Sequence, residues 1–337
     1  MQIKIDQSYK RLDKFLFQYF ESIPLSLLQR LIRKYKIKIN NKKSKANSPL
    51  IKGDVVYIYY KFEINNELSN TIKLNKDKKK IFKDHIIFQN DDFIVINKID
   101  GYSVQRGSKV FISLKDIYEN VIEHKLYIVH RLDKDTSGLI VVAKSDKAYL
   151  GLREQFTNHS AKRNYVALIW GNPELNIHFQ KKKIEFYLEK DKTYRINGKI
   201  GRHPFERTKM SIRNDNNGKH AITRFKIIEK YIFKNKIVAC LVECWLETGR
   251  THQIRVHMDA LSHGIVGDPV YRSGKKTDTN LIKTLGGEFI NFKRQALHAR
   301  NLSFIHPITS EFKNFDITLP NDFIKLKDSF SKLSASK

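Results

Sequence analysis

The sequence predicts an α+β protein in which a small N-terminal domain precedes a larger one. Its 337 residues, 41% of them apolar, suffice for two domains with a substantial core. From about residue 85, stretches typical of strands are mixed with stretches of helical periodicity. The strand-like stretches cover 138–144, 164–170, 222–229 and 236–247, and the helical ones cover 146–157 and 251–262.

Residues 1–62 indicate a small module of two helices and a short sheet. Apolar residues recur at helical spacing in RLDKFLFQYF and again in SLLQRLIRKY, whose other side carries Arg30, Arg33 and Lys34. KIKIN and GDVVYIYY then alternate like strands. The three cations indicate either an RNA-docking surface or a basic face that is only solvated, and this segment alone does not separate the two.

The domain boundaries follow from changes in composition. Residues 63–84 lose their periodicity and gather asparagine and lysine, which predicts a linker. Residues 85–328 form the expected second domain. The last residues, 329–337, read SFSKLSASK, and a frayed tail is expected there.

The charge balance points to a polyanionic partner. The chain has 63 lysines and arginines against 35 acidic residues, a net charge of +28, which favours nucleic acid as the partner. Its apolar runs are too short to span a membrane, and its first residues lack the apolar core of a secretory signal. We therefore expect a cytoplasmic protein without a membrane partner.

The residue patterns argue against a metal site. Cys240 and Cys244 have the spacing of one strand face and do not form a CxxC pair. The run from Asp133 to Gly138 fits the start of a calcium loop, but Lys144 stands where that loop needs a bidentate glutamate. The histidines around His252 do not form HExxH.

The stretch HRLDKDTSGL, residues 130–139, holds the most informative carboxylate. Asp133 lies on a turn before the apolar run LIVVAK, with His130 and Arg131 close in sequence. Positive charge from these neighbours would favour the ionised carboxylate. An ionised, positioned aspartate is a candidate nucleophile or base, whereas the alternative is an aspartate that only braces the turn.

A second stretch, LETGRTHQIRVHMDALSHG, supplies a candidate partner for this carboxylate. It predicts a turn followed by a helix that Thr251 can cap, with His252 and Arg255 on one face. An arginine on a helix is held more rigidly than one on a loop, which suits the orientation of a carboxylate.

HRLDKDTSGLIVVAK resembles the signature of the RluA-type pseudouridine synthases. Further stretches resemble that family's motifs and follow its order, namely VINKIDGYSVQRGSK, KRNYVALIWG, TGRTHQIRVHM, HGIVGDPVY and RQALHARNLSFIHP. The first 62 residues resemble an S4-like RNA-binding domain. The resemblance spans nearly the whole chain except 61–84 and 172–219. Two positions depart from the family pattern, because Ile99 replaces a proline and Arg163 replaces a lysine.

The resemblance implies a fold and a reaction. The expected fold is a mixed, mainly antiparallel sheet flanked by helices, and the expected reaction is the isomerisation of uridine, which needs no cofactor or metal. Asp133 would be the catalytic residue, acting either as a nucleophile or by removing a proton. Tyr165 would stack on the uracil and handle a proton, and Arg255 would pair with Asp133. The expected supporting residues are His130, Arg131 and Arg250, with Arg131 holding the extruded base.

The resemblance also suggests a substrate. The N-terminal helix stretch and the GYSVQRGS loop are most similar to the RluC branch, which acts on large-subunit (23S) ribosomal RNA. Arg30, Arg33 and Lys34 would then contact RNA. Two alternatives stay open, which are the same chemistry on transfer RNA and a protein that binds ribosomal RNA without catalysis.

Overall fold

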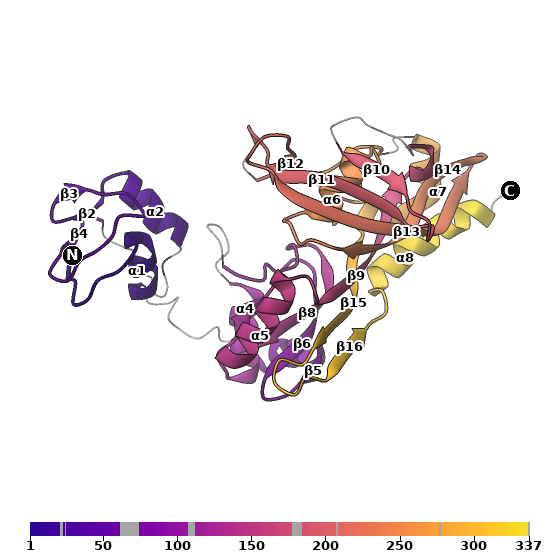
Figure 1. Ribbon diagram of the computed structural model, residues 1–337. Helices are drawn as coiled ribbons and strands as arrows, with labels where there is room; N and C mark the ends of the chain where they lie inside the picture. Colours follow the sequence, from indigo (N-terminus) through magenta and orange to yellow (C-terminus); the bar gives the residue numbers. More distant parts are fainter. Residues whose placement is uncertain are drawn as a thin grey trace. The chain divides into compact units, whose positions relative to one another are not determined.

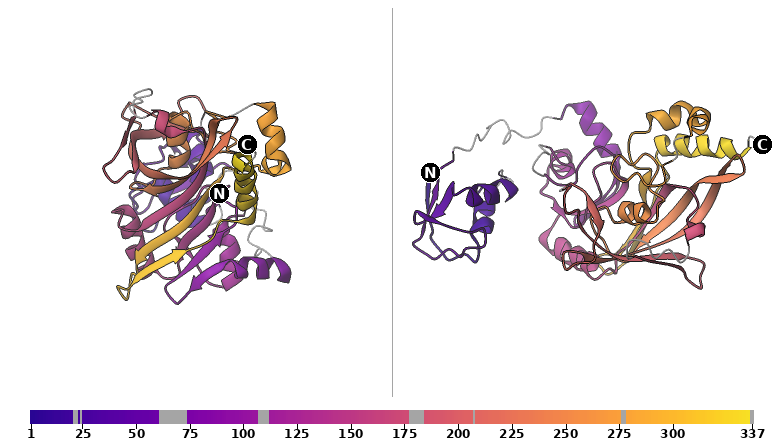
Figure 2. Two further views of the ribbon diagram at one scale, coloured as in Figure 1. Left: turned by 90° about the vertical axis from the view of Figure 1, so that its right-hand side faces the viewer. Right: turned by 90° about the horizontal axis from the view of Figure 1, so that it is seen from above.

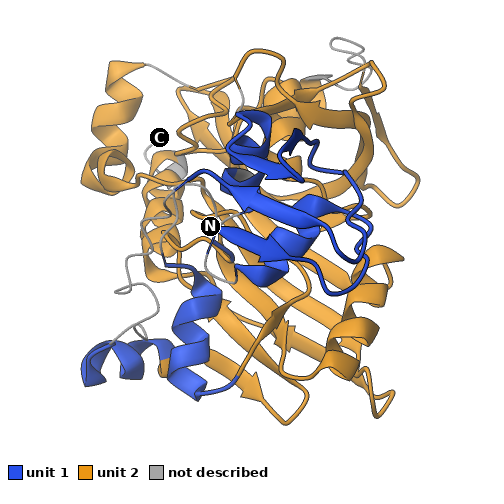
Figure 3. Ribbon diagram, turned by 90° about the vertical axis from the view of Figure 1, so that its left-hand side faces the viewer, with its two compact units in different colours: residues 1–82, 105–124 blue, residues 83–104, 125–337 orange. Residues whose placement is uncertain are grey.

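The computed structural model describes residues 1–20, 23, 25–60, 74–106, 112–176, 184–206, 208–275 and 278–335. The chain divides into two compact units (Figure 3). Unit 1 comprises Met1–Phe82 and Gln105–His124, and unit 2 comprises Lys83–Val104 and Lys125–Lys337. The segment 105–124, which we expected in the second domain, therefore groups with unit 1.

Unit 1 begins with a four-stranded antiparallel sheet covered on one face by two helices (Figure 1). The strands are β1 (Gln2–Lys4), β2 (Ile37–Ile39), β3 (Lys42–Lys43) and β4 (Val55–Ile58), in the order β1-β4-β2-β3. The helices are α1 (Leu12–Tyr19) and α2 (Leu25–Arg33), whose leucines pack against Ile37 and Val56. Both helices were predicted, whereas β1 is too short to show alternation in sequence.

Unit 1 also contains α4 (Leu114–Ile122) and most of α3 (Lys76–Asp84). The rings of Phe82 and Tyr118 meet edge-on with centroids 5.9 Å apart, and the Tyr118 hydroxyl donates to the carbonyl oxygen of Phe82 at 3.0 Å. The expected linker 63–84 is thus helical from Lys76, and its residues 63–73 lie outside the described residues. A single buried aromatic in a lysine-rich run gave too little periodicity to predict this helix.

In the described part of unit 2, twelve strands form one sheet, with the main order β10-β11-β13-β14-β9-β15-β8-β6-β5. Strands β7, β12 and β16 pair at its sides with β8, β11 and β15. The strands are β5 (Ile86–Gln89), β6 (Phe93–Lys98), β7 (Tyr127–Ile128), β8 (Ser137–Ala143), β9 (Lys162–Trp170), β10 (Glu185–Leu188), β11 (Tyr194–Arg202), β12 (Met210–Ile212), β13 (Lys219–Phe233), β14 (Lys236–Leu246), β15 (Leu297–Ile305) and β16 (Phe312–Asp316). Among the described strands only β8 and β15 pair in parallel, which confirms the expected mainly antiparallel sheet.

Helices of unit 2 lie along this sheet (Figure 2). They are α5 (Asp146–Thr157), α6 (Gln253–Ala260), α7 (Thr279–Asn291), α8 (Asn321–Ala335) and a 3₁₀ turn η2 (Pro173–Asn176). The expected cap at Thr251 is absent, because His252 precedes α6 with a left-handed φ of 59°. No helix among the described residues combines the length and apolar composition needed to cross a membrane.

The C-terminal segment corrects one expectation. Residues from 329 were expected to fray, but α8 continues to Ala335. Phe330 is fully buried and contacts Trp170 and Tyr231, with ring centroids 5.8 Å from each. Burial of the Phe330 ring anchors the last turns of α8, so this end of the helix does not fray as expected.

Cys240 and Cys244 lie on β14 and are buried, reduced thiols. Their burial confirms that they pack as small apolar groups on one strand face. Burial raises the pKa of the Cys240 thiol to about 12 and raises that of Cys244 as well.

Acidification is expected to destabilise unit 2 through two buried histidines. Burial lowers the pKa of His257 to about 3 and, as the main cause, that of His298 to about 4. Both values lie below the pKa of roughly 6.5 in an unfolded chain. The contribution of each neutral histidine to the free energy of unfolding is therefore fully present above pH 6.5 and is lost as the pH falls toward the pKa of the folded state. At pH 5 the loss is about 2 kcal/mol for each histidine.

Urea unfolding at pH 7 and pH 5 measures this loss. His257→Asn replaces a titrating ring with an amide that can still bond Thr223 Oγ1, which lies 2.9 Å from His257 Nδ1. The variant should lose less stability on acidification than the wild type. If the variant lost as much unfolding free energy between pH 7 and pH 5 as the wild type, His257 would make no contribution to the loss.

Candidate active site

Asp133 lies on the turn between β7 and β8. Its carbonyl oxygen accepts a hydrogen bond from the backbone nitrogen of Thr136 at 3.1 Å, and β8 begins at once with seven buried residues. Gly138 has φ 114° and faces the backbone of Ala299, where any side chain would overlap the Ala299 carbonyl. The glycine therefore allows β8 and β15 to approach closely, which fixes where the turn that carries Asp133 ends.

A buried lysine supports the same turn. The Nζ atom of Lys98, at the end of β6, donates to the carbonyl oxygens of Lys134 at 2.8 Å and Ile99 at 2.9 Å. Lys98 is fully buried, and burial lowers its pKa to about 8. Gln295 Nε2 donates to Thr136 Oγ1 at 3.0 Å. The backbone directly after Asp133 is thus tied to elements distant in sequence.

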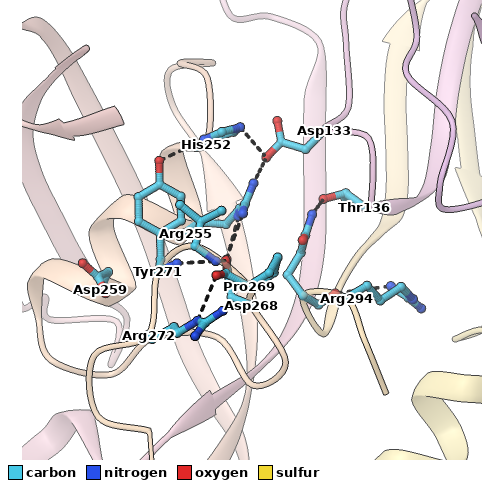
Figure 4. Close-up of polar contacts among 12 residues, drawn as sticks. Asp133, Thr136, His252, Arg255, Asp259, Asp268, Pro269, Tyr271, Arg272 and Arg294 are labelled. Atoms are coloured by element: carbon cyan, nitrogen blue, oxygen red, sulfur yellow. Dashed lines mark hydrogen bonds and ion pairs between the residues drawn. The ribbon is translucent and has the colours of Figure 1, made fainter. Parts of the chain in front are cut away.

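Arg255, on α6, joins Asp133 to a second aspartate (Figure 4). Its Nη1 lies 3.1 Å from Asp133 Oδ2, while Nε and Nη2 donate to the two oxygens of Asp268 at 2.6 and 2.9 Å. Asp268 is fully enclosed and also accepts from the backbone nitrogens of Val270 and Tyr271. Burial works to lower the pKa of Arg255, but Asp268 and Asp133 outweigh it and raise that pKa, so the guanidinium stays charged.

His252 and Tyr271 complete this network (Figure 4). His252 Nε2 lies 3.8 Å from Asp133 Oδ2, and its Nδ1 lies 2.9 Å from the hydroxyl of Tyr271. The Tyr271 ring lies under the guanidinium of Arg255, 4.9 Å from centroid to Cζ. Burial is the main cause that lowers the pKa of His252, although Asp133 opposes it. Asp133 Oδ2 is therefore engaged, while no donor in the described part of the chain bonds to Oδ1.

These groups open into a pocket of about 410 Å³ in unit 2. Asp133, with 15% of its side chain exposed, lines this pocket together with Tyr165 on β9. Tyr165 is 5% exposed, and burial raises the pKa of its phenol, so the hydroxyl is protonated at neutral pH. The pocket thus brings together a carboxylate, a guanidinium and a phenol.

The lining of the pocket is cationic. Its described residues include four arginines, Arg131, Arg163, Arg250 and Arg255, against the single carboxylate of Asp133. The guanidinium of Arg163 lies 5.4 Å from the Phe156 ring centroid, and its Nε and Nη2 have no hydrogen-bond partner among the described residues. Four guanidinium groups against one carboxylate suit an anionic ligand.

The expected supporting residues differ in their surroundings. Arg131 is exposed at the pocket, and Arg250 lines it while its Nε donates to the carbonyl oxygen of His220 at 3.0 Å. His130 stacks on Phe156 with centroids 4.1 Å apart, and its Nε2 accepts from the backbone nitrogen of Val141. Burial lowers the pKa of His130 well below its usual value, so its charge cannot favour the ionised Asp133 as we expected.

The residues expected to bind RNA lie in unit 1. Arg30 and Arg33 are on α2 and Lys34 follows it, and all three are exposed. No ion pair holds these three cations among the described residues. This placement agrees with either of the two interpretations of the basic helix.

Sequence reasoning missed Asp268, Lys98 and Tyr271. Asp268 lies in HGIVGDPVY and Lys98 in VINK. Both stretches carry the resemblance to the family, but it implied no role for these two residues. The Gly-Asp-Pro turn was the available signal for Asp268, since an aspartate there can brace a turn and still reach a cation.

Similarity to known proteins agrees with this geometry. Residues 92–260 match the family described as RNA pseudouridylate synthase, and residues 10–56 match the S4 domain. A protein of Zymomonas mobilis named ribosomal large subunit pseudouridine synthase D is 38% identical, over 70% of this chain and 69% of its own length. A protein of Buchnera aphidicola named ribosomal large subunit pseudouridine synthase C is 33% identical, over 94% of this chain and 91% of its own length.

A solved structure extends the comparison to the fold. Human RNA pseudouridylate synthase domain containing 4 matches with a TM-score of 0.57 and 22% identity, over 75% of this chain and 95% of that chain. The family match and the curated relatives thus define an enzyme that modifies RNA, with a pseudouridylate synthase domain and an S4 domain. The chain belongs to the RNA pseudouridylate synthase family. Its activity is accordingly that of an isomerase acting on uridine in RNA.

Proposed function

We propose that the enzyme converts specific uridines of large-subunit ribosomal RNA to pseudouridine, with Asp133 as its catalytic residue. The observation that carries this proposal is the Asp133 carboxylate, held by Arg255 in the wall of a cationic pocket that also contains Tyr165. The names of the Zymomonas and Buchnera relatives favour ribosomal RNA as the substrate. A ribosomal substrate would place the enzyme in the cytoplasm.

The reaction breaks the bond between ribose and a uracil nitrogen, turns the base, and rejoins it through a ring carbon. The proton lost from that carbon matches the proton gained by the freed nitrogen, so the change is an isomerisation. Asp133 acts on the ribose, as a nucleophile or as a base that removes a proton. Arg255 occupies Oδ2 and leaves Oδ1 for the substrate.

Entry into this pocket requires the uridine to leave its stack. Extrusion costs a few kcal/mol and least in loops and bulges, which favours irregular regions of RNA as targets. Arg131, exposed at the pocket, supports the extruded state. Arg163 and Arg250 offer their charge to the phosphates of the extruded nucleotide. Arg30, Arg33 and Lys34 supply phosphate contacts from unit 1.

Two substitutions of Tyr165 distinguish the stacking of its ring from the transfer of a proton by its hydroxyl. Tyr165→Phe keeps the ring and removes the hydroxyl, so kcat should fall about 100-fold with KM for RNA nearly unchanged. Tyr165→Leu should also raise KM, because it removes the stacking face. Single-turnover kinetics on a substrate RNA measures both. Full activity of the phenylalanine variant would assign the hydroxyl no role in proton transfer.

Pseudouridine mapping in a deletion strain tests the substrate. Both ribosomal and transfer RNA are mapped with and without a plasmid that encodes the chain. Loss and recovery of sites in large-subunit ribosomal RNA would support the proposal, whereas changes confined to transfer RNA would overturn it. Altered ribosome assembly with no missing pseudouridine would favour a protein that binds without catalysis.

A further inference from the structure

The four-stranded sheet of unit 1 has one face turned away from its helices (Figure 1). Ile3, Ile37, Val56 and Ile58 point to the helices and are buried. The strand register then brings Tyr57 beside Lys38 and Lys38 beside Lys43 on the other face. Side chains alternate along a strand, so these three share that face.

Two further tyrosines extend this row. The rings of Tyr57 and Tyr59 are nearly parallel, at 11°, with centroids 6.3 Å apart. Lys38 Nζ lies 5.2 Å from the centroid of Tyr59, and Lys43 Nζ lies 4.6 Å from that of Tyr35. We name these five residues, Tyr35, Lys38, Lys43, Tyr57 and Tyr59, the tyrosine–lysine face. About half of each outer tyrosine stays accessible, since Tyr35 is 48% and Tyr59 is 51% exposed.

Tyr35 occupies a position that usually holds glycine. It follows α2 with φ 57°, and its backbone nitrogen bonds the carbonyl oxygen of Ile32 while that of Lys36 bonds Leu31. These bonds form a Schellman motif with Tyr35 at the left-handed position, where a bulky side chain is strained. A tyrosine that is unfavourable for the fold and leaves its ring exposed suggests a role for the ring outside the fold.

The charge of this face selects its partner. Lys38 and Lys43 make no salt bridge to a carboxylate within the described residues, so their charge is available to an anion. Double-stranded RNA keeps its base faces stacked inside the helix and offers only phosphates and sugars to such a surface. Unpaired nucleotides offer both a flat base for each open ring and a phosphate for each lysine.

We propose that the tyrosine–lysine face binds unpaired nucleotides of RNA, with bases stacked on Tyr35 and Tyr59 and phosphates against Lys38 and Lys43. The site differs from the pocket of Asp133, from the cations Arg30 and Arg33 of α2, and from Lys34, which follows that helix. It does not depend on which residue carries out the isomerisation, nor on which RNA is modified.

The full-length chain is tested by fluorescence anisotropy with a short oligouridine and with a blunt RNA duplex of equal length. Tyr35→Gly combined with Tyr59→Leu should weaken oligouridine binding by about ten-fold or more and leave duplex binding nearly unchanged. Tyr35→Gly should not lower the unfolding midpoint, since glycine suits its backbone. The matched variants Tyr35→Phe and Tyr59→Phe should bind like the wild type. So should Phe312→Leu, which alters an exposed aromatic on β16.

A second measurement isolates the lysines. Lys38→Gln combined with Lys43→Gln should make the salt dependence shallower by about 1.4 in the slope of log K against log salt, about 0.7 for each lost phosphate contact. Equal losses on oligouridine and duplex, or unaltered oligouridine affinity in the tyrosine variants, would overturn the proposal. Because neither RNA needs to be modified, failure of the proposed ribosomal activity leaves this test intact.

Discussion

Replacement of Asp133 with asparagine is expected to lower kcat at least about a thousand-fold while RNA affinity stays within about two-fold of the wild type. The amide oxygen can still accept the hydrogen bond from Arg255 Nη1, which now lies 3.1 Å from Oδ2, so the network should persist. An amide is neither a nucleophile for ribose nor a base. Only the chemical step should therefore be lost.

Single-turnover conversion of a substrate RNA measures the effect of Asp133→Asn, with filter binding for affinity. Asp91→Asn, an exposed aspartate in the turn between β5 and β6, is the charge-matched control and should act like the wild type. Conversion by Asp133→Asn within ten-fold of the wild type would remove Asp133 from the chemistry.

Neutralisation of Asp268 should have the second largest effect. Asp268 accepts from two of the three guanidinium nitrogens of Arg255, Nε and Nη2, and its side chain is completely enclosed. Asp268→Asn leaves the guanidinium with one carboxylate, so its Nη1 is no longer aimed firmly at Asp133. We expect kcat to fall about 100-fold with KM nearly unchanged, because a misplaced catalytic group loses rate rather than affinity.

The same variant should lose about 3 kcal/mol of unfolding free energy, since it breaks a buried ion pair. A purely structural role for Asp268 would lower stability while kcat, measured well below the unfolding midpoint, stayed normal. Asp259→Asn on α6 is the control. The Asp259 side chain accepts from the backbone nitrogen of Ser273 at 3.0 Å, and no hydrogen bond or ion pair among the described residues joins it to the Arg255 guanidinium, so the kcat of this variant should be normal.

The sequence was sufficient to predict which residues meet at the centre of the site. Asp133 and Arg255 are 122 residues apart, yet each lies in a motif whose order and spacing resemble one family. Their contact confirms that pairing. Their roles in the reaction stay predictions. Tyr165 likewise reaches the same pocket from β9.

The supporting residues could not be predicted, because their partners are chosen by tertiary structure. The acceptors of Lys98 are two backbone carbonyls, which carry no sequence signal. Asp268 follows a short Gly-Asp-Pro turn that by itself suggests only local bracing. His130 was expected to be a cation, but its ring stacks on Phe156 and its burial lowers its pKa well below the usual value.

Parts of the fold were missed for similar reasons. Strands β10, β11 and β12 lie in the basic region 172–219, where lysine and arginine interrupt the alternation that marks a strand. Strand β11 is recognisable through its pairing with β10, β12 and β13. In α8, by contrast, Phe323, Leu326, Phe330 and Leu333 do recur at helical spacing, and the small polar residues around them hid this pattern.

The inaccessibility of Cys240 and Cys244 has a practical consequence for experiments on the whole enzyme. Thiol-reactive dyes attack the thiolate, which is scarce when a thiol is enclosed and its pKa is raised. A cysteine introduced at an exposed position in each unit should therefore accept a fluorophore while both natural thiols stay unlabelled. Energy transfer between such dyes could then follow the separation of the two units as RNA is added.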